Sequence, residues 1–454
     1  MGRPFACVWC AVVAALSCPH GATAQPASTD GDVPQALALV GGVVFDGERF
    51  ERRDVFVHEG QFVRDRPAEV DTVLDVSGGF LVPPYGDFHS HVLASPWNLE
   101  AAEARYLREG TFYVQNMTDA ASQIAIARSR FEAPGTLDVA YALGGFTSTN
   151  SHPQILIESY AQGLNPFRLT PEERTTVLAS RTAENDSYWL VDPPSRVAEV
   201  WPQFMAGQPD LVKVYLLDVA AGLAAGDMAG HGLHPDVLVE VVRHAHDADL
   251  RVLAHVETAQ DVQLALDAGV DGFVHLPGYA VTAYAPARYD TLAASGWRLY
   301  HLDDATVKRL AERQSVVSPT VFLASTSMRW NYPDRPARLT AVRARQWDTL
   351  RRLKAAGVRV TIGLDSAQGT TWAEADYMAT HGLFSPAEML QMWATETPQA
   401  IFPDRQLGEI REGYEGSLLV LNCDPLETFS CTQDIRVRLK DGLLLPPMPP
   451  ASDE

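Results

Sequence analysis

The chain reads Gly86-Asp87-Phe88-His89-Ser90-His91 at the end of an apolar run. We expect this run to be a β-strand, and side chains at positions i and i+2 of a strand point to the same face. The imidazoles of His89 and His91 can therefore reach one metal ion beyond the end of the strand. The pair His244 and His246 has the same spacing but falls in a predicted helix, where the two side chains diverge by about 200°. We interpret that second pair as surface or packing histidines.

Eight runs that can form strands follow one another from residue 80 onward, and helical patterns separate them. This alternation is typical of parallel βαβ units. The predicted strands are Phe80–His91, Thr111–Asn116, Leu137–Leu143, Leu211–Leu217, Arg251–His255, Gly272–His275, Ser315–Pro319 and Arg359–Gly363. Eight parallel strands favour a closed (β/α)8 barrel of the TIM type, which is an α/β fold with the helices packed outside.

Four more residues that can bind a metal stand at the ends of these predicted strands. They are Lys213, His255, His275 and Asp365. The carboxyl ends of all strands of a barrel meet at one mouth, so these side chains would converge with His89 and His91. Histidine and carboxylate ligands favour zinc. The convergence of six such residues, rather than any one of them, predicts a metal site.

Two of the six residues admit a second interpretation. Lys213 lies between Val212 and Val214, and a buried bare ammonium is costly, so this lysine could instead form a salt bridge at the barrel mouth. His275 could be a hydrogen-bonding neighbour of the ligands rather than a ligand. Ordinary packing of the other four would require four coincidences at strand ends.

The two ends of the chain carry a different pattern from the central region. Short alternating runs broken by glycines precede the barrel pattern, and strands such as Ser417–Leu421 follow it. We expect residues 25–79 and 396–454 to form one small β-sandwich domain and residues 80–395 to form the barrel.

The composition excludes some partners. The net charge of the 454-residue chain is -21, and recognition of nucleic acid or of an anionic membrane requires clustered Lys and Arg. A small molecule or a short peptide is the expected partner, with no nucleic acid. No segment after the first 24 residues is long and apolar enough to span a membrane. A homo-oligomer remains open.

The first residues resemble an export signal. Arg3 precedes an apolar run, and small residues lead up to Ala24, which predicts a signal peptide over residues 1–24 and a secreted, periplasmic protein. A membrane anchor is the alternative, but the apolar run is shorter than the ~20 residues that a spanning helix needs. A lipid-modified Cys18 is a further alternative with a poorer match.

Cleavage of this signal would leave two cysteines, Cys423 and Cys431. A close pair in an oxidising compartment is compatible with a disulfide. Two separate small core residues are the equal alternative, because spacing alone does not show that the two Cα atoms approach within ~7 Å.

Together these motifs resemble the amidohydrolase superfamily. Within it, the chain is similar to imidazolonepropionase-like proteins and Xaa-Pro dipeptidases, also through its closing segments Leu407–Ile410 and Asp424–Leu426. The resemblance covers nearly the whole chain after the leader. It implies that the barrel is a metal-dependent hydrolase in which a metal-bound hydroxide cleaves an amide or peptide C–N bond, as in a dipeptide or an N-acyl amino acid.

The resemblance also implies a role for each site residue. The histidine pair of the first strand would hold one zinc ion, and His255 and His275 would hold a second. Lys213, carbamylated by carbon dioxide, would bridge the two ions. Asp365 would bind one ion and act as the catalytic proton shuttle. Without the carbamate, a single zinc on the first pair, His255 and Asp365 becomes the better hypothesis.

The resemblance also suggests substrate contacts, and a metal-bound hydroxide admits other reactions. The loop after the third strand contains His152, which together with Tyr215 could hold a carboxylate or carbonyl, although a loop histidine and a packing tyrosine are equally compatible. Residues 165–208 exceed the usual connection of ~2 to 6 residues and are expected to form a lid. The alternatives are a lactonase or organophosphate esterase, and a catalytically silent metal-binding protein, against which Asp365 argues.

Overall fold

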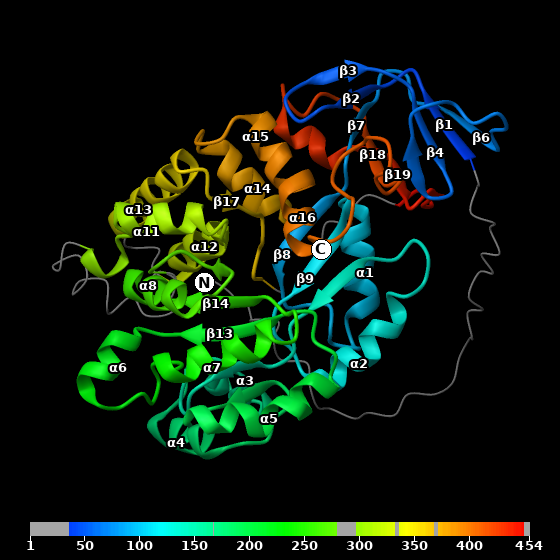
Figure 1. Ribbon diagram of the computed structural model, residues 1–454. Coiled ribbons are helices and arrows are strands. Elements are labelled where there is room, and N and C mark those ends of the chain that lie inside the picture. Colours follow the sequence, from blue (N-terminus) through cyan, green and yellow to red (C-terminus); the bar gives the residue numbers. More distant parts are fainter. Residues whose placement is uncertain (1–35, 167, 279–296, 332–335, 367–370, 449–454) are drawn as a thin grey trace, which may run out of the picture.

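The chain folds into a mixed α/β structure, in which β-rich sheets lie at one end and parallel strands surrounded by helices form the rest (Figure 1). The computed structural model describes residues 36–166, 168–278, 297–331, 336–366 and 371–448. The expected signal peptide lies outside these described residues.

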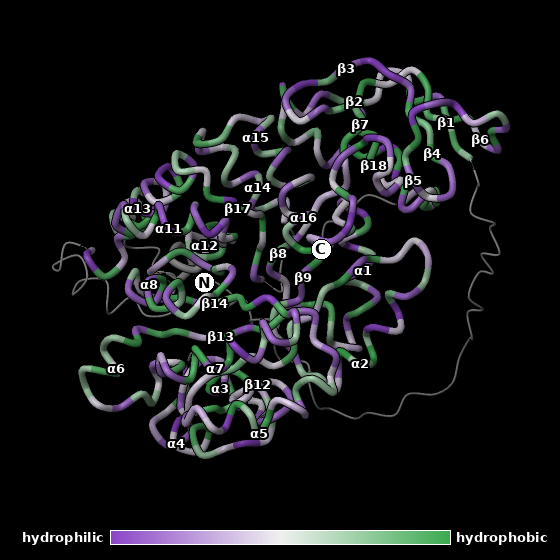
Figure 2. The backbone as a smooth tube through the Cα atoms, in the orientation of Figure 1, coloured by the Kyte–Doolittle hydropathy of each residue, from purple (hydrophilic) through white to green (hydrophobic). Residues whose placement is uncertain are grey.

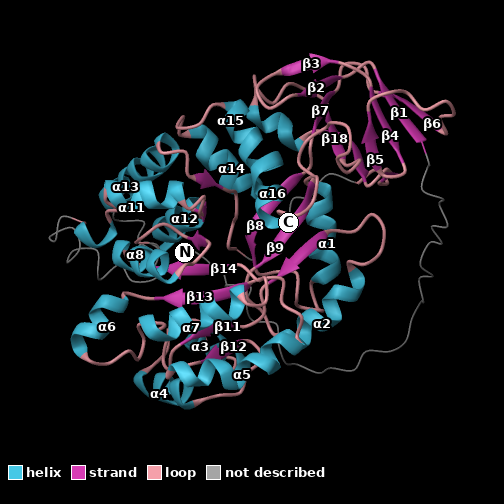
Figure 3. Ribbon diagram, in the orientation of Figure 1, coloured by secondary structure: helices cyan, strands magenta, loops and turns pink. Residues whose placement is uncertain are grey.

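Both ends of the chain supply the β-rich part, which Figure 3 shows as a group of magenta strands apart from the helices. One sheet has the order β5-β4-β1-β6, and the other has the order β20-β19-β18-β7-β2-β3. The strands are β1 (Ala36–Val40), β2 (Val43–Phe45), β3 (Phe50–Arg52), β4 (Val55–His58), β5 (Gln61–Val63), β6 (Thr72–Asp75), β7 (Phe80–Val82), β18 (Leu418–Leu421), β19 (Ile435–Lys440) and β20 (Leu443–Leu444). Leu37 and Leu39 alternate along β1 and pack in one apolar core with Leu418 and Leu439, so strands from both chain ends share this core.

The remaining strands are parallel and form two sheets, with the orders β10-β9-β8 and β12-β11-β13-β14-β15-β16-β17. They are β8 (Tyr85–Ser90), β9 (Thr111–Asn116), β10 (Asp138–Tyr141), β11 (Gly145–Thr147), β12 (Tyr188–Leu190), β13 (Val212–Leu216), β14 (Val252–Val256), β15 (Gly272–Val274), β16 (Val316–Ser318) and β17 (Arg359–Val360). Each of the eight predicted strands has a counterpart here. β11 and β12 were not predicted.

The first predicted strand needs a correction. Residues 80–91 form two strands rather than one, because β7 pairs with β18 and β2 in the six-stranded sheet, whereas β8 pairs with β9. Pro83 and Pro84 separate them. A proline has no N–H to donate to a strand ladder, so two in succession end the pairing.

Backbone contacts join the two parallel sheets at both sides. The N–H of Phe88 donates to the carbonyl of Ile362 at 2.8 Å, and the N–H of Asp365 donates to the carbonyl of His89 at 2.8 Å. On the other side, residues 142 and 211 form a parallel bridge. The closed eight-stranded barrel itself remains a prediction.

Helices cover the parallel strands. They are α1 (Leu99–Arg108), α2 (Ala121–Arg130), α3 (Gln154–Ala161), α4 (Pro171–Ala179), α5 (Pro194–Ala206), α6 (Val219–Ala225), α7 (Pro235–His246), α8 (Ala259–Ala268), α11 (Asp304–Glu312), α12 (Val321–Asn331), α13 (Pro336–Ala355), α14 (Thr371–Thr380), α15 (Pro386–Gln391) and α16 (Thr397–Ile401), with the 3-10 helices η1 (Arg298–Tyr300) and η3 (Phe429–Gln433) and the π-helical turn η2 (Met392–Glu396). Hydrophobic and hydrophilic residues alternate along these segments (Figure 2). α8 shows why such helices form: Thr258 and Asp261 make a capping box at its start, and Gly269 ends it with a φ of 93°.

The segment expected to be a lid has regular structure instead. Residues 165–208 contain α4, β12 and α5, and β12 pairs with β11 at the edge of the seven-stranded sheet. Trp189 and Phe204 of this segment are buried and pack near Phe146. The segment therefore extends the core, because its aromatic residues find apolar partners there.

Cys423 and Cys431 form a disulfide, with their Cα atoms 5.4 Å apart. The sequence left this pairing open. Within the described residues, no helix combines the length and the apolar character needed to cross a bilayer.

Candidate metal centre

His89 and His91 stand at the carboxyl end of β8, where a buried carboxylate supports them. Asp87 accepts the backbone N–H of His89 at 3.0 Å through Oδ1 and the hydroxyl of Tyr106 at 2.7 Å through Oδ2. Burial raises the pKa of Asp87 to about 6. Because both carboxylate oxygens are engaged, Asp87 fixes the end of the strand that carries the two histidines.

Three side-chain atoms form a nearly equilateral triangle at this point. His89 Nε2 lies 3.2 Å from His91 Nε2, and Asp365 Oδ1 lies 3.4 Å from the first and 3.1 Å from the second. A tetrahedral ion with bonds of about 2.0 to 2.1 Å separates its ligand atoms by roughly 3.3 Å. The donor atoms and their spacing therefore fit a divalent metal such as zinc. This triad is the group of metal-binding side chains that gathers within 4.8 Å in the described part of the chain.

The position of Asp365 depends on an unusual backbone. Asp365 has a φ of 54°, a left-handed conformation that is uncommon for residues other than glycine and that clusters at functional sites. Burial by itself raises the pKa of this carboxyl, but the imidazoles of His89 and His91 outweigh burial and hold the pKa well below its usual range. Asp365 is therefore ionised at neutral pH.

Gly363 allows the segment after β17, which carries Asp365, to approach β8 closely. A Cβ at Gly363 would lie 2.8 Å from the backbone nitrogen of His89 and 2.6 Å from Ser318 Oγ. Real Cβ atoms do not come this close to other atoms. The absence of a side chain at this position is thus a condition for the triangle.

His275 follows β15 and approaches Asp365 from the other side. Its Nδ1 lies 2.7 Å from Thr320 Oγ1, and its Nε2 lies 3.8 Å from Asp365 Oδ2. His275 has a φ of 72° and Thr320 a φ of 47°, which is rare for a β-branched residue. The two strained residues together turn Nε2 of His275 toward the centre.

His255 and Lys213 complete the group of predicted ligands. The ring centroids of His255 and His275 are 4.7 Å apart, and Lys213, on the adjacent strand β13, is 2% exposed. Burial lowers the pKa of Lys213 to about 7 and, together with the nearby Lys213 charge, lowers the pKa of His255 to about 3. The structure thus brings all six predicted residues to one place, although Lys213, His255 and His275 lie outside the triangle.

The two tentative substrate residues lie beside the same centre. The ring of His152 is 5.1 Å from that of Tyr215 and 5.3 Å from that of His255. The hydroxyl of Tyr215 lies 2.9 Å from Thr118 Oγ1. Burial lowers the pKa of His152 well below its usual value, so its imidazole is neutral.

The second histidine pair with i, i+2 spacing, His244 and His246, lies away from this centre, as predicted. Both residues are on α7, where His244 packs against Trp201 with ring centroids 5.2 Å apart. His246 Nε2 is 3.0 Å from Asp271 Oδ2. They are packing and surface histidines.

Two carboxylates near the centre were missed. Glu257 Oε1 lies 2.9 Å from His255 Nε2, and the i, i+2 spacing of this pair is a signal that could have found it. Glu374 is fully buried and accepts the backbone N–H groups of Val321 at 2.9 Å and Phe322 at 2.6 Å. Burial raises the pKa of Glu374 to about 8. No sequence pattern indicates this contact, because α12 and α14 meet only in the folded protein.

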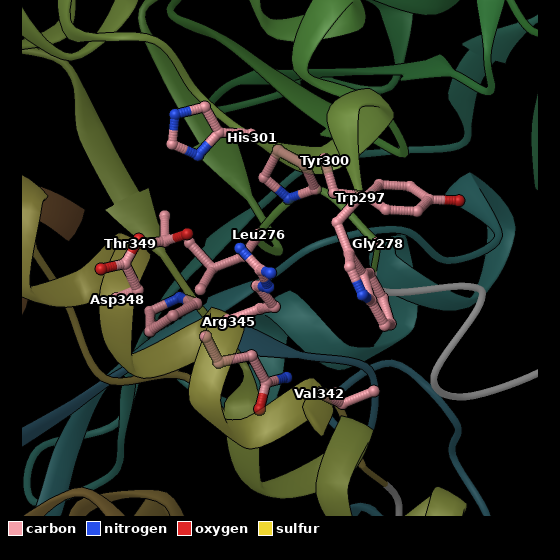
Figure 4. Close-up of a pocket in the computed structure, with 12 residues that line it drawn as sticks. Leu276, Gly278, Trp297, Tyr300, His301, Val342, Arg345, Asp348 and Thr349 are labelled. Carbon is pink, nitrogen blue, oxygen red and sulfur yellow. The ribbon is translucent and has the colours of Figure 1, made fainter. Parts of the chain in front are cut away.

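A pocket lies next to the strand ends that carry the centre (Figure 4). Its lining includes Leu276 and Gly278, which follow His275, and Trp297 and Tyr300, whose rings face it. The hollow is open to solvent at its mouth.

A cluster of polar residues at the carboxyl ends of parallel strands, with helices on the outside, is the arrangement of an α/β enzyme. The chain belongs to the amidohydrolase family, whose family model matches residues 199–442, more than half of the chain.

One similar protein is the ochratoxinase of Aspergillus niger, which is 26% identical over 202 residues that cover 44% of this chain. The match spans 38% of the length of that curated relative. The crystal structure of A. niger ochratoxinase aligns with a TM-score of 0.68 and 18% identity, over 91% of this chain and 96% of that one.

Two other solved structures share the fold. A Xaa-Pro dipeptidase with bound methionine in its active site aligns with a TM-score of 0.66 and 18% identity, over 90% of this chain and 99% of that one. A prolidase complexed with N-methylphosphonate-L-proline aligns with a TM-score of 0.64 and 21% identity, over 90% and 99% of the two chains.

Proposed function

We propose that this chain is a metal-dependent amidohydrolase that cleaves an amide or peptide C–N bond. The observation that carries this proposal is the triangle of His89 Nε2, His91 Nε2 and Asp365 Oδ1, whose sides of 3.1 to 3.4 Å suit one tetrahedral ion. Membership of the amidohydrolase family supports the reaction class. His and carboxylate donors favour zinc as the metal.

A second ion is part of the proposal. His255 and His275 would hold it, and a carbamate on Lys213 would bridge the two ions. The pKa of Lys213 supports this modification, because burial lowers it to about 7 and leaves a large share of neutral amine at neutral pH. The neutral nitrogen can bond to the carbon of carbon dioxide and release one proton, which converts an unfavourable buried ammonium into an anionic oxygen donor.

The residues of the chain can then carry out the hydrolysis. A bound divalent metal supplies Lewis-acid activation of water and of the scissile carbonyl. Asp365 is ionised and would accept a proton from the attacking water, then deliver it to the leaving nitrogen as the C–N bond breaks. His152 and Tyr215, beside His255, would hold the carboxylate or carbonyl of the substrate.

We propose a dipeptide or an N-acyl amino acid as the substrate. The methionine in one solved relative and the prolyl phosphonate in another support an amino-acid leaving group. The side chain of the substrate would enter the pocket that begins after His275, which has Trp297 and Tyr300 in its wall.

The same proposal covers the architecture and location. The two parallel sheets, joined by the hydrogen bonds between β8 and the segment after β17, would form one closed (β/α)8 barrel from residues 80–395. Residues 25–79 and 396–454 would form the small β-sandwich domain. The Cys423–Cys431 disulfide supports secretion into the periplasm, because such bonds persist in oxidising compartments.

The first test is the metal content of the purified protein. Wild type and Lys213→Ala are prepared with bicarbonate and without chelators, and metal per chain is measured by elemental analysis, with Lys308→Ala at an exposed lysine as the matched control. Two ions in wild type and the control, and fewer in Lys213→Ala, are expected. One ion in all three would refute the carbamate-bridged pair, and none would refute the metal-dependent hydrolase.

The second test is substrate class. Pooled dipeptides and N-acyl amino acids are incubated with wild type and Asp365→Asn, alongside lactones and aryl phosphates. Cleavage of the amides by wild type alone is expected. Cleavage of only lactones or phosphates would indicate the alternative esterase activity, and cleavage of nothing by a metal-loaded wild type would indicate a silent binder.

A further inference from the structure

The histidines of the centre differ in which ring nitrogen is held by a neighbour. In His91, Nδ1 lies 3.2 Å from the carbonyl oxygen of Thr118. In His275, Nδ1 lies 2.7 Å from Thr320 Oγ1. In both residues Nε2 therefore faces Asp365, and a neutral imidazole that donates through Nδ1 offers the lone pair of Nε2 to a metal.

His255 has the opposite arrangement. Its Nε2 lies 2.9 Å from Glu257 Oε1. With Glu257 ionised, its oxygen accepts the hydrogen bond and the proton of this contact lies on Nε2. The lone pair of a neutral His255 is then on Nδ1. Burial favours the neutral ring, because the imidazole is 5% exposed.

Glu257 is held in place by the start of the following helix. Its backbone N–H donates to Asp261 Oδ2 at 3.2 Å, and its carbonyl accepts the N–H of Gly278 at 2.8 Å. Asp261 is fully buried and also accepts the N–H groups of Thr258 and Val219 at 2.9 Å. The carboxylate therefore projects from a fixed backbone, two residues after His255.

The 2.9 Å between Glu257 Oε1 and His255 Nε2 is the usual length of an N–H···O hydrogen bond. We propose that Glu257 is a positioning residue that keeps the proton of His255 on Nε2, so that Nδ1 is the atom that His255 offers to the second metal. This inference rests on the proposed metal-dependent function.

The proton position can be read directly by nuclear magnetic resonance. The protein is labelled with ¹⁵N at its 13 histidines, stripped of metal, and studied with long-range ¹H–¹⁵N correlation at neutral pH, with His255→Gln used to assign the signals. Wild type should show a protonated Nε2 and an unprotonated Nδ1 at His255. Glu257→Met, of similar size without an acceptor oxygen, should give a mixture of the two tautomers.

Metal binding provides the second readout. Loss of such an outer carboxylate lowers metal affinity by roughly 10- to 100-fold, so the second zinc should bind that much more weakly to Glu257→Met. Glu257→Gln keeps an acceptor oxygen and should restore most of the affinity and the wild-type tautomer. Glu240→Met, at a partly exposed glutamate that pairs with Arg243, is the matched control and should bind both ions as wild type does.

The outcomes separate this inference from the proposed function. A proton on Nδ1 in wild type, or an unchanged spectrum in Glu257→Met, would overturn the positioning role even if two ions bind. Equal loss of the second ion in Glu257→Gln and Glu257→Met would make Glu257 a direct ligand and also overturn it. Absence of any bound ion in wild type would overturn the proposed function alone, because the tautomer is measured without metal.

Discussion

The close approach of Gly363 to β8 leads to the sharpest prediction. Gly363→Ala adds one methyl group at a point where the two parallel sheets are joined by backbone hydrogen bonds of 2.8 Å on either side. The new Cβ would lie 2.8 Å from the backbone nitrogen of His89 and 2.9 Å from its Cβ. We expect His89 to be displaced and the metal triangle to be distorted, while the rest of the fold persists.

The magnitude follows from these contacts. Two carbon atoms in contact are separated by about 3.5 to 4.0 Å, so His89 must retreat by at least roughly 0.6 Å. A functional constellation tolerates about 0.5 Å. Overpacking of this kind costs about 1 to 3 kcal/mol, which corresponds to roughly a 5- to 150-fold loss of metal affinity if the strain is relieved at the site.

Competition with a zinc-binding dye gives the affinity, and thermal unfolding of the metal-free protein gives the stability. Gly382→Ala is the control. A Cβ there meets no atom within 4 Å, so zinc affinity should be unchanged, although the φ of 68° makes the substitution lower the unfolding temperature. The double variant Ser318→Ala/Gly363→Ala removes the other close contact, of 2.6 Å, and should remain impaired. Wild-type affinity in Gly363→Ala, or its recovery in the double variant, would refute the reasoning.

Three further predictions concern stability. Burial raises the pKa of Glu374 from 4.5 to about 8. The stabilisation by the protonated side chain is therefore complete below pH 4.5 and is lost as the pH rises through 8. Relative to Glu374→Gln, the unfolding free energy of wild type should fall by up to roughly 5 kcal/mol between these two pH values. Parallel pH profiles of urea unfolding for the two proteins would contradict this. Replacing Cys423 and Cys431 by serine should lower the free energy of unfolding in guanidinium by roughly 2 to 3 kcal/mol, since the disulfide no longer closes a short loop in the unfolded chain. An unchanged guanidinium midpoint would contradict this prediction. Tyr106→Phe should lower the free energy of unfolding by about 1 to 3 kcal/mol, because the buried Asp87 carboxylate loses its 2.7 Å hydrogen bond. A urea midpoint equal to that of wild type would show that this bond contributes nothing.

Local patterns were sufficient for much of the fold. Strand propensity and spacing located eight of the ten parallel strands, because the period-2 pattern and the helical pattern are both properties of short segments. The two prolines at positions 83 and 84 could have predicted the break between β7 and β8, because a proline cannot donate to a strand ladder. We nevertheless predicted residues 80–91 as one strand. β11 and β12 were not found, since three-residue strands depend on the neighbours that pair with them.

The candidate site also has a part that the sequence predicted and a part that it did not. His89 and His91 were predicted from their spacing, and the other four predicted residues were predicted from the convergence of strand ends. The contact of Glu374 with α12 was not predictable, because it joins residues more than 50 positions apart.

The sequence by itself determined which residues stand at the carboxyl ends of the parallel strands, because strand periodicity orients each side chain relative to its own neighbours. The tertiary structure alone decided how they meet. The left-handed backbones of Asp365 and His275, the space left by Gly363 and the bond from Glu257 to His255 all depend on segments packed from elsewhere in the chain. Only tertiary packing can hold these left-handed backbones and this hydrogen bond in place, since no short segment would adopt either arrangement in isolation.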